Sequence, residues 1–356
     1  MGNFCSEPDE HSNGRFEGRG KPIVTITGVS GFLGSHTLMA FLKDGSYHVR
    51  GTVRSTTNAK KMAPLKKAFG NLYSQIEFVE ADLNDEASLN AAIKGSTYVV
   101  HTASPFFLGS KTEEEMVKPA VDGTMSVVRA CREHKVKRLV ITSSCGSVKF
   151  GYAPDDPDRP ADNVFTEEHW TKTDSPGLDF YVKSKPLAEK AAWDYQASLP
   201  ESERFELVTL LPSMMLGPSM TSGDSTSEQS VKAIVSGYMN PIMKTSMGVI
   251  DVRDCALAHL QAIQIEEAKN QRFIVNNREM WMIDMAKLIA EEFNPKGFNV
   301  CTTEAEAGST IYFSADFCSN EKIKRVFGMK FREPKEMLTD MINGMIESGS
   351  LAAPAK

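Results

Sequence analysis

The chain has 356 residues, of which 41% are hydrophobic and 24% charged, a composition typical of a globular protein with one large or two modest domains. Its net charge of −6 argues against a nucleic-acid-binding surface as the main function. The six cysteines form no Cys-x-x-Cys pair, the histidines show no metal-ligand spacing, and no apolar run is long enough to span a membrane. We therefore expect a cytoplasmic protein with reduced thiols, no bound metal and no nucleic-acid partner.

Residues 1–20 are rich in polar residues and predict a disordered tail. At its start, Gly2 and Ser6 fit the pattern for N-myristoylation, and Cys5 between them could carry a palmitoyl chain. One myristoyl group gives only marginal membrane binding, and the acidic residues that follow supply no polybasic patch, so Cys5 would have to be the second signal. The tail predicts peripheral membrane attachment if it is acylated, and an unmodified leader is the alternative.

A strand, a glycine-rich turn and a helix follow the tail. The β-branched run at residues 21–27 predicts a buried strand, and apolar residues at helical spacing from Leu33 onward predict a helix. On the turn between them, Gly28 lets the turn tighten, Gly31 lets the backbone approach a pyrophosphate, and Gly34 lets the helix pack closely on the strand. The helix N-terminus also offers free N–H groups to phosphates. This order of elements predicts a dinucleotide-binding site.

Strands and helices then alternate along the chain. Further strands are predicted at residues 47–53, 76–80, 97–101, 138–142 and 205–211, with helical patterns between most of them. Such alternation predicts an α/β fold of the Rossmann type, a doubly wound parallel sheet with right-handed crossovers. In such sheets the ligand binds beyond the carboxyl ends of the strands.

Two stretches interrupt this alternation and set the expected domain boundaries. Residues 151–180 predict an irregular excursion, and residues 213–230 predict a second long loop. Short strands at 242–254 and 272–276 predict a smaller C-terminal lobe. We therefore expect the following organisation: a Rossmann domain at 21–212 that includes the excursion, a mainly substrate-binding lobe with returning Rossmann elements at 213–345, and a flexible C-terminal tail at 346–356.

The residues that can carry chemistry lie at one strand end and on the helix after the excursion. Tyr181 and Lys185 are four residues apart, which places them on one helix face. A tyrosine can donate a proton to a carbonyl, and a nearby ammonium lowers the phenol pKa from about 10 toward the working pH. Ser144 follows the strand at 138–142, where a hydroxyl can hydrogen-bond the substrate oxygen.

With these motifs, the chain resembles the extended short-chain dehydrogenase/reductases. It is most similar to the branch of plant dihydroflavonol reductases, cinnamoyl-CoA reductases and microbial aldehyde, ketone and methylglyoxal reductases, over about residues 21–330. The resemblance implies that Ser144, Tyr181 and Lys185 are catalytic and that Lys185 also holds the nicotinamide ribose. Taken with the glycine turn, the expected cofactor-binding residues are Gly28, Ser30, Gly31, Phe32, Leu33, Gly34, Arg54, Lys61, Asp82, Leu83, Ala103, Ser104, Tyr181, Lys185, Pro212, Ser213 and Met214.

Two departures from the resemblance bear on the site. Pro186 removes a helix hydrogen bond to Val182 and disfavours helical geometry in Lys185. Lys149 stands where plant dihydroflavonol reductases have an asparagine that contacts the flavonoid, and the Asn-Trp-Tyr-Cys motif of cinnamoyl-CoA reductases is absent. Neither plant substrate is therefore assumed for this chain.

The residue after the strand at 47–53 predicts the choice of cofactor. It is Arg54, where an Asp or Glu would bind the ribose 2′-hydroxyl of NAD; an arginine suits the 2′-phosphate of NADP. The resemblance places Lys61 beside the same phosphate. A solvated basic turn is the alternative.

The sequence therefore predicts NADPH-dependent reduction of an aldehyde or ketone to an alcohol, with Tyr181 as proton donor and a small-molecule carbonyl compound as substrate. One alternative is an NAD-dependent enzyme of the hydroxysteroid dehydrogenase or nucleotide-sugar epimerase type. Another is a non-catalytic NADP-binding sensor or scaffold, although the intact Ser144, Tyr181 and Lys185 argue against it. The substrate, the pathway and the choice between monomer and dimer stay open.

Overall fold

The structure is a computed structural model that describes residues 20–104, 112–221, 225–306 and 316–354. Gly2 and Cys5 of the predicted acylation motif lie outside these residues, as does the rest of the tail up to residue 19. None of the described helices is both long and apolar enough to cross a membrane.

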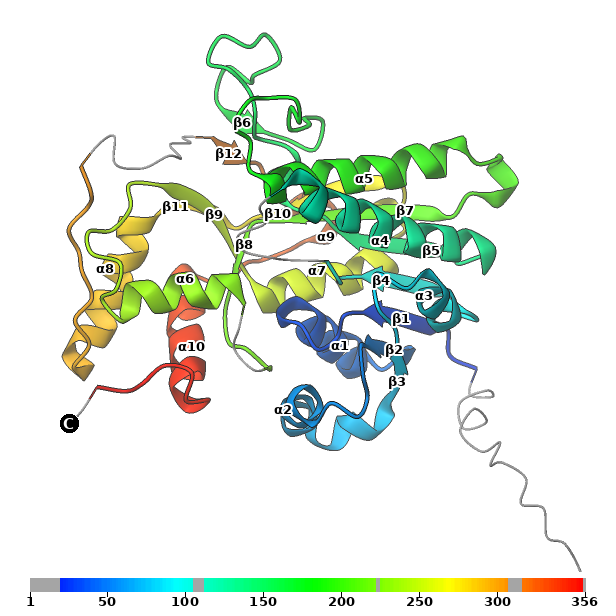
Figure 1. Cartoon of the computed structure of the whole chain (residues 1–356), viewed down its shortest axis with the longest axis horizontal. Coiled ribbons are helices and arrows are strands. Elements are labelled where there is room, and N and C mark those ends of the chain that lie inside the picture. The colour runs from blue at the N-terminus through cyan, green and yellow to red at the C-terminus, as the bar shows by residue number, and fades with distance from the viewer. Residues whose placement is uncertain (1–19, 105–111, 222–224, 307–315, 355–356) are drawn as a thin grey trace, which may run out of the picture.

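A parallel sheet of seven strands forms the centre of the larger part of the molecule (Figure 1). All of its neighbouring strands pair in parallel, as the sequence predicted. Strand order reverses between β1 and β4, and a ligand is expected to bind at such a switch point. From one edge to the other, the strands are β10 (Gln271–Val275), β7 (Glu206–Pro212), β5 (Arg138–Thr142), β4 (Tyr98–His101), β1 (Ile23–Thr27), β2 (His48–Val53) and β3 (Ile76–Glu80).

Helices cover both faces of this sheet, which explains why its strands are apolar on both sides. Val100 and Val140 belong to the core shared with α1 (Phe32–Asp44) and α7 (Val252–Gln264). Their neighbours Val99 and Leu139 belong to the core shared with the helices of the other face. Those helices are α3 (Glu86–Ile93), α4 (Glu113–Glu133) and α5 (Phe180–Ser198), and α2 (Ala59–Phe69) joins the first core.

A smaller lobe lies beside the sheet, to the left in Figure 1. Its three-stranded sheet has β9 in the middle, parallel to β8 and antiparallel to β11. Buried methionines and aliphatic residues such as Val231, Ile289 and Met341 join this sheet to the helices of the lobe. The elements are β8 (Met214–Leu216), α6 (Thr226–Val235), β9 (Ser246–Asp251), β11 (Arg278–Trp281), α8 (Met282–Phe293) and α10 (Pro334–Glu347).

Three segments differ from the sequence predictions. The stretch at 213–230 is not a loop throughout, since it contains β8 and the start of α6. The strand predicted at 272–276 joins the main sheet as β10 instead of the lobe, because it pairs with β7. The predicted tail from residue 346 begins later: α10 runs to Glu347, and Leu351 is buried in the lobe core.

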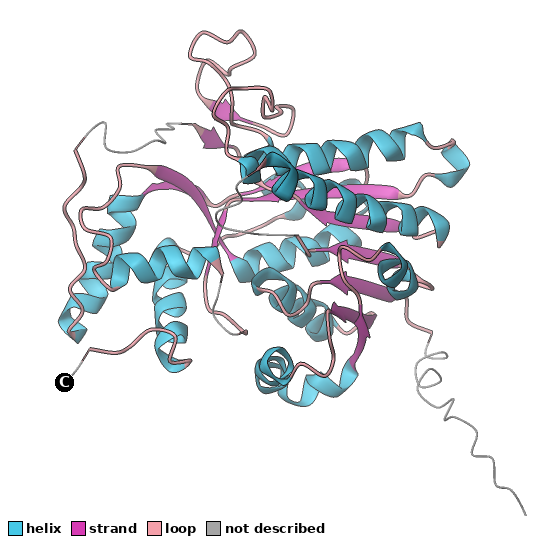
Figure 2. Cartoon of the chain, in the orientation of Figure 1, coloured by secondary structure: helices cyan, strands magenta, loops and turns pink. Residues whose placement is uncertain are grey.

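The excursion at 151–180 is mostly irregular, as Figure 2 shows. Its one strand among the described residues, β6 (Val164–Phe165), pairs with β12 (Phe317–Cys318). The remaining elements are α9 (Glu321–Phe327), which packs on β10, and short 3₁₀ helices η1 (Gly70–Gln75), η2 (Cys145–Ser147), η3 (Glu201–Glu203), η4 (Glu266–Ala268) and η5 (Asn294–Lys296).

Candidate active site

The glycine turn after β1 brings three chain segments into close contact. Gly28 has a φ of +72°, and a β-carbon there would lie 2.9 Å from the β-carbon of Ala103. A β-carbon at Gly34 would lie 2.3 Å from the carbonyl oxygen of Gly28, closer than any real contact of this kind. These contacts explain the glycines at both positions by the turn and packing roles that the sequence predicted.

The start of α1 fits a bound phosphate. Gly31 is the N-cap residue and makes no side-chain capping bond, so no side chain at that position competes for the free N–H groups of the first turn. Phe32 and Leu33 are the first two residues of the helix. The role of Gly31 beside a pyrophosphate stays a prediction that this geometry supports.

A hydrogen-bonded cluster braces the two strands at the switch point. The N–H of Ala103 donates to Oγ1 of Thr27 over 3.2 Å, and the hydroxyl of Thr102 donates to the carbonyl of Thr27 over 2.6 Å. The same Oγ1 lies 2.8 Å from Nδ1 of His101. Burial lowers the pKa of His101 to about 4, with the charge of Lys185 as a lesser cause, so this imidazole is neutral at pH 7.

Arg54 follows the end of β2 and is exposed, and it makes no hydrogen bond or ion pair with another described residue. The loop that carries it is fixed, because the N–H and hydroxyl of Thr56 donate to Glu80 over 2.6 and 2.8 Å. Asn58 caps α2 by accepting a bond from the N–H of Lys61. This free guanidinium on a braced loop fits a cofactor phosphate.

The other predicted cofactor residues also lie beyond carboxyl ends of strands in the main sheet. Asp82 and Leu83 follow β3, and Ala103 and Ser104 follow β4. Pro212 ends β7 and Met214 begins β8. The N–H of Ser213, between them, donates to the carbonyl of Val275 over 3.2 Å.

At the end of β5, two neighbouring serines have different environments. Ser143 is buried, and its hydroxyl donates to Glu189 over 2.6 Å. Ser144 is half-buried, and its Oγ accepts a hydrogen bond from the N–H of Gly146 over 3.0 Å. Ser144 is therefore the serine that can reach a substrate.

Tyr181 and Lys185 lie on the first two turns of α5, which packs against η2, the turn after Ser144. Asp179 caps the helix by accepting the N–H of Tyr181 over 2.9 Å, and the helix continues through Pro186. The Nζ of Lys185 lies 5.0 Å from the ring centre of Tyr181 and donates to Oγ of Ser104 over 2.7 Å. The helix thus places the tyrosine and the lysine beside Ser104, one of the residues predicted to bind the cofactor.

Burial dominates the protonation of this pair. It raises the pKa of Tyr181 to about 12, with Asp179 as a lesser cause, and it lowers the pKa of Lys185 to about 8. The predicted lowering of the tyrosine pKa is therefore wrong for the chain alone, because desolvation of the phenolate outweighs the nearby ammonium. Tyr181 keeps its proton at neutral pH, as a proton donor must.

Lys149, at the position where the resemblance implies a substrate contact, is buried in an ion pair that the sequence did not reveal. Its Nζ lies 3.3 Å from Glu279 on β11 and donates to the carbonyl of Asp316 over 3.0 Å. Oγ of Ser213, Oδ1 of Asn276 and Oε2 of Glu279 are among the six buried polar side-chain atoms that have no hydrogen-bond partner in the described residues. Lys149 and Glu279 are far apart in sequence, so no local pattern signals the pair.

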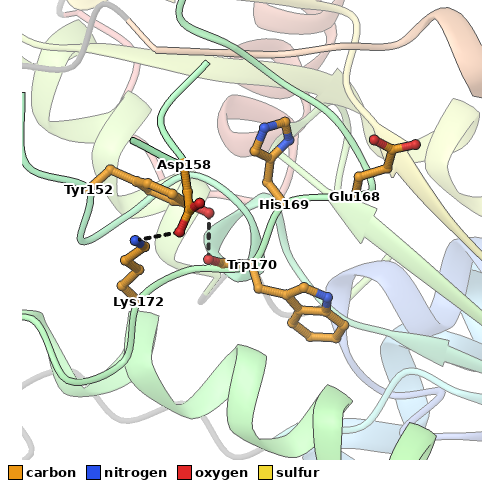
Figure 3. Close-up of a pocket in the computed structure, with 6 residues that line it drawn as sticks. All are labelled: Tyr152, Asp158, Glu168, His169, Trp170 and Lys172. Carbon is orange, nitrogen blue, oxygen red and sulfur yellow. Dashed lines mark hydrogen bonds and ion pairs between the residues drawn. The ribbon is translucent and has the colours of Figure 1, made fainter. Parts of the chain in front are cut away.

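A pocket of about 390 Å³ lies on the excursion (Figure 3). In the close-up, Lys172 is directed at Asp158, and Tyr152 donates to the carbonyl of Trp170 over 2.7 Å. No predicted site residue lines the pocket, so we do not assign it to the substrate. Among the described residues, no cluster of three or more His, Cys, Asp or Glu side chains could hold a metal ion.

Comparisons with known proteins find relatives along nearly the whole length of the chain. The curated relatives include tetraketide alpha-pyrone reductase 1 of Arabidopsis thaliana, 33% identical over 93% of this chain and 98% of its own length. They also include the NADPH-dependent methylglyoxal reductase of Saccharomyces cerevisiae, 31% identical over 91% of this chain and 98% of its own length. Among solved structures, the yeast methylglyoxal/isovaleraldehyde reductase complexed with NADPH matches with a TM-score of 0.77 and 29% identity, over 92% of this chain and 99% of that one.

The family model that matches the chain spans residues 25–296, from within β1 to the end of η5. That span contains the glycine turn, Ser144, Tyr181 and Lys185. The chain belongs to the 3-beta hydroxysteroid dehydrogenase/isomerase family, within the extended short-chain dehydrogenase/reductases.

Proposed function

We propose that this chain reduces an aldehyde or ketone to an alcohol with NADPH. One observation carries the proposal: α5, which carries Tyr181 and Lys185, packs against the turn after Ser144, and Lys185 donates to Ser104 beyond the end of β4 at the switch point of the sheet. When bound, NADPH supplies the hydride. The hydroxyl of Ser144 donates a hydrogen bond to the carbonyl oxygen, and Tyr181 gives that oxygen its proton. Lys185 holds the nicotinamide ribose and stabilises the phenolate that is left.

Arg54 supports NADPH over NADH. A guanidinium that has no partner among the described residues and lies at the end of β2 can pair with a 2′-phosphate, and no carboxylate takes its place there to bind a 2′-hydroxyl. The remaining cofactor-binding residues predicted from the sequence belong to this proposal. The proposal also includes a division of the chain into a cofactor domain at 21–212 and a mainly substrate-binding lobe after it.

NAD-dependent oxidation of a hydroxysteroid remains the second candidate, because the family model bears that name. Arg54 argues against it. A non-catalytic NADP-binding protein is the third candidate, and the set of Ser144, Tyr181 and Lys185 argues against that one.

A panel of carbonyl compounds decides among the three. Methylglyoxal, branched aldehydes, aromatic aldehydes and ketones would be incubated with the protein and NADPH, and absorbance of NADPH would be followed; a hydroxysteroid with NAD⁺ would be tested in parallel. We expect NADPH consumption with at least one carbonyl compound. Oxidation of the steroid alone would support the second candidate, and tight NADPH binding without turnover of any compound would support the third.

We also propose that the N-terminal tail is acylated and attaches this otherwise cytoplasmic enzyme to a membrane. The support is the sequence alone: Gly2 and Ser6 fit the myristoylation pattern, and Cys5 offers a second acyl site. Intact-mass measurement on protein from a eukaryotic host should show added acyl mass, and Gly2→Ala should move the protein into the soluble fraction. An unmodified N-terminus, or identical fractionation of both proteins, would contradict the proposal.

A further inference from the structure

A fully buried carboxylate lies one turn beyond Lys185 on the catalytic helix. Tyr181, Lys185 and Glu189 recur every four residues and so share one face of α5. Only 1% of Glu189 is exposed, and its carboxylate accepts bonds from Ser143 over 2.6 Å and from Thr209 over 2.8 Å. The sequence signal for Glu189 is its place four residues after Lys185, which continues the spacing of Tyr181 and Lys185.

Arg272 on β10 completes the set of donors to Glu189. Its Nε donates to the carboxylate over 2.7 Å, and this ion pair is almost entirely buried. The other end of the guanidinium donates to the backbone carbonyls of Glu167 and His169 over 2.6 and 2.9 Å. It also stacks on Trp170, 3.6 Å from the ring centre. Arg272 therefore joins the catalytic helix to the excursion.

The excursion returns to the turn that carries Ser144. The hydroxyl of Thr171 donates to the carbonyl of Gly146 over 2.7 Å, and its N–H donates to the carbonyl of Ser147 over 2.9 Å. Gly146 itself donates to Oγ of Ser144. The contacts thus form a closed ring: Glu189 on α5, Ser143 at the end of β5, the turn after Ser144, the excursion at 167–171, and Arg272.

We propose that Glu189 and Arg272 are positioning residues for the reaction: their buried ion pair holds the turn that carries Ser144 at a fixed place relative to Tyr181 and Lys185. This inference rests on the proposed reductase function. Neither residue touches a reacting atom. Glu189 acts through Ser143, the immediate neighbour of Ser144, and Arg272 acts through the excursion that holds the other side of the same turn.

The energetics favour a positioning role over a gain in stability alone. A buried ion pair often adds little net stability, because desolvation offsets the attraction of the two charges. It does fix geometry, since every oxygen of this carboxylate has a donor in a set position. Misplacement of a catalytic group by about 1 Å can lower a rate about 10²-fold.

The test compares Glu189→Gln with a matched control, Glu206→Gln. Glu206 also pairs with a buried arginine, Arg138, over 2.6 Å, but at the amino ends of β5 and β7, opposite the site. For both variants, kcat and KM with the best carbonyl substrate, the Kd of NADPH, and hydrogen exchange of residues 143–148 would be measured at temperatures where each protein is folded by circular dichroism.

We expect Glu189→Gln to lower kcat about 10²-fold, to leave the Kd of NADPH unchanged and to speed exchange at 143–148. Glu206→Gln should change none of the three in folded protein. If Glu189→Gln does not fold, Ser143→Ala is the second variant, because it removes one bond to Glu189 and leaves the ion pair intact. Ser143→Ala should also lower kcat, by a smaller factor than is expected for Glu189→Gln.

Three results would overturn the inference. An unchanged kcat in the folded Glu189 variant, or in Ser143→Ala when that variant replaces it, would remove the positioning role. The same loss of kcat in Glu206→Gln would show a general effect of breaking a buried ion pair. A parent protein that turns over no carbonyl compound would instead contradict the reductase function itself, and the positioning role with it.

Discussion

The proposed cofactor end and the proposed substrate end of this site are built by different means. At the cofactor end, Gly28 and Gly34 set the geometry through backbone contacts, as the 2.3 Å approach of a β-carbon at Gly34 to the carbonyl of Gly28 shows. At the substrate end, side chains from distant segments meet: Lys149 follows the turn after β5, and Glu279 comes from β11 of the lobe.

This difference indicates which half of the site cannot change without disturbing the fold. A backbone turn tolerates few changes, because each added atom meets main chain that cannot move away. An arrangement of side chains can change while the strands stay in place. The cofactor end should therefore be the sensitive part for folding and NADPH binding, and the substrate end the part that sets which carbonyl compound is accepted.

The largest effect is expected from Tyr181→Phe. The ring and its packing stay, and only the proton donor is lost, so turnover should fall by about 10²–10⁴-fold while NADPH binding is kept. Steady-state rates with the best carbonyl substrate, together with a fluorescence titration of NADPH, measure both quantities. A phenylalanine variant with the parent rate would show that another group donates the proton.

Next in size is Gly34→Ala. The added methyl group meets the carbonyl of Gly28, so we expect a loss of about 1–3 kcal/mol in the free energy of unfolding and weaker NADPH binding. The control is Gly344→Ala in α10, where the nearest atom to a β-carbon is 3.8 Å away. That change should stabilise the helix by about 0.5–1 kcal/mol. Urea titrations of both variants give the comparison, and equal stability of the two would refute it.

Arg54→Ala should lower kcat/KM with NADPH about tenfold and leave kcat/KM with NADH unchanged. A lost charge-assisted bond to phosphate is worth about 1.5–3 kcal/mol, and the lower end of that range, about tenfold, applies on an exposed loop. The measurement is kcat/KM for each cofactor in parent and variant. An equal preference for both cofactors in the parent would already contradict the assignment of Arg54.

The smallest effect on the scaffold is expected at the substrate end. Lys149→Met combined with Glu279→Leu replaces a buried ion pair by apolar groups, which is often neutral for stability. NADPH affinity should stay the same, and the ranking of carbonyl substrates by KM should change. A double variant that loses NADPH binding but keeps the parent's ranking of substrates would contradict the assignment of Lys149 and Glu279 to the substrate end.

The sequence predicted the parts of the site that depend on local order. The glycine turn follows from a strand, three glycines and a helix in succession, and the face shared by Tyr181 and Lys185 follows from helical spacing. The predictions were wrong where contacts between residues far apart in the sequence determine the outcome. An apolar run such as 272–276 indicates a strand but not its partner, which proved to be β7. The pKa of Tyr181 depends on how deeply the fold buries it, and the order around Leu351 depends on the lobe core.

The most direct test of the central claim follows the hydride itself. The protein would be incubated with a carbonyl substrate and NADPH that carries deuterium at both C4 positions of the nicotinamide ring, and the alcohol would be analysed by mass spectrometry. The account predicts deuterium on the carbon that was the carbonyl carbon, in the parent protein and at a much lower rate in Tyr181→Phe. An alcohol without deuterium at that carbon, formed while NADPH is consumed, would contradict it.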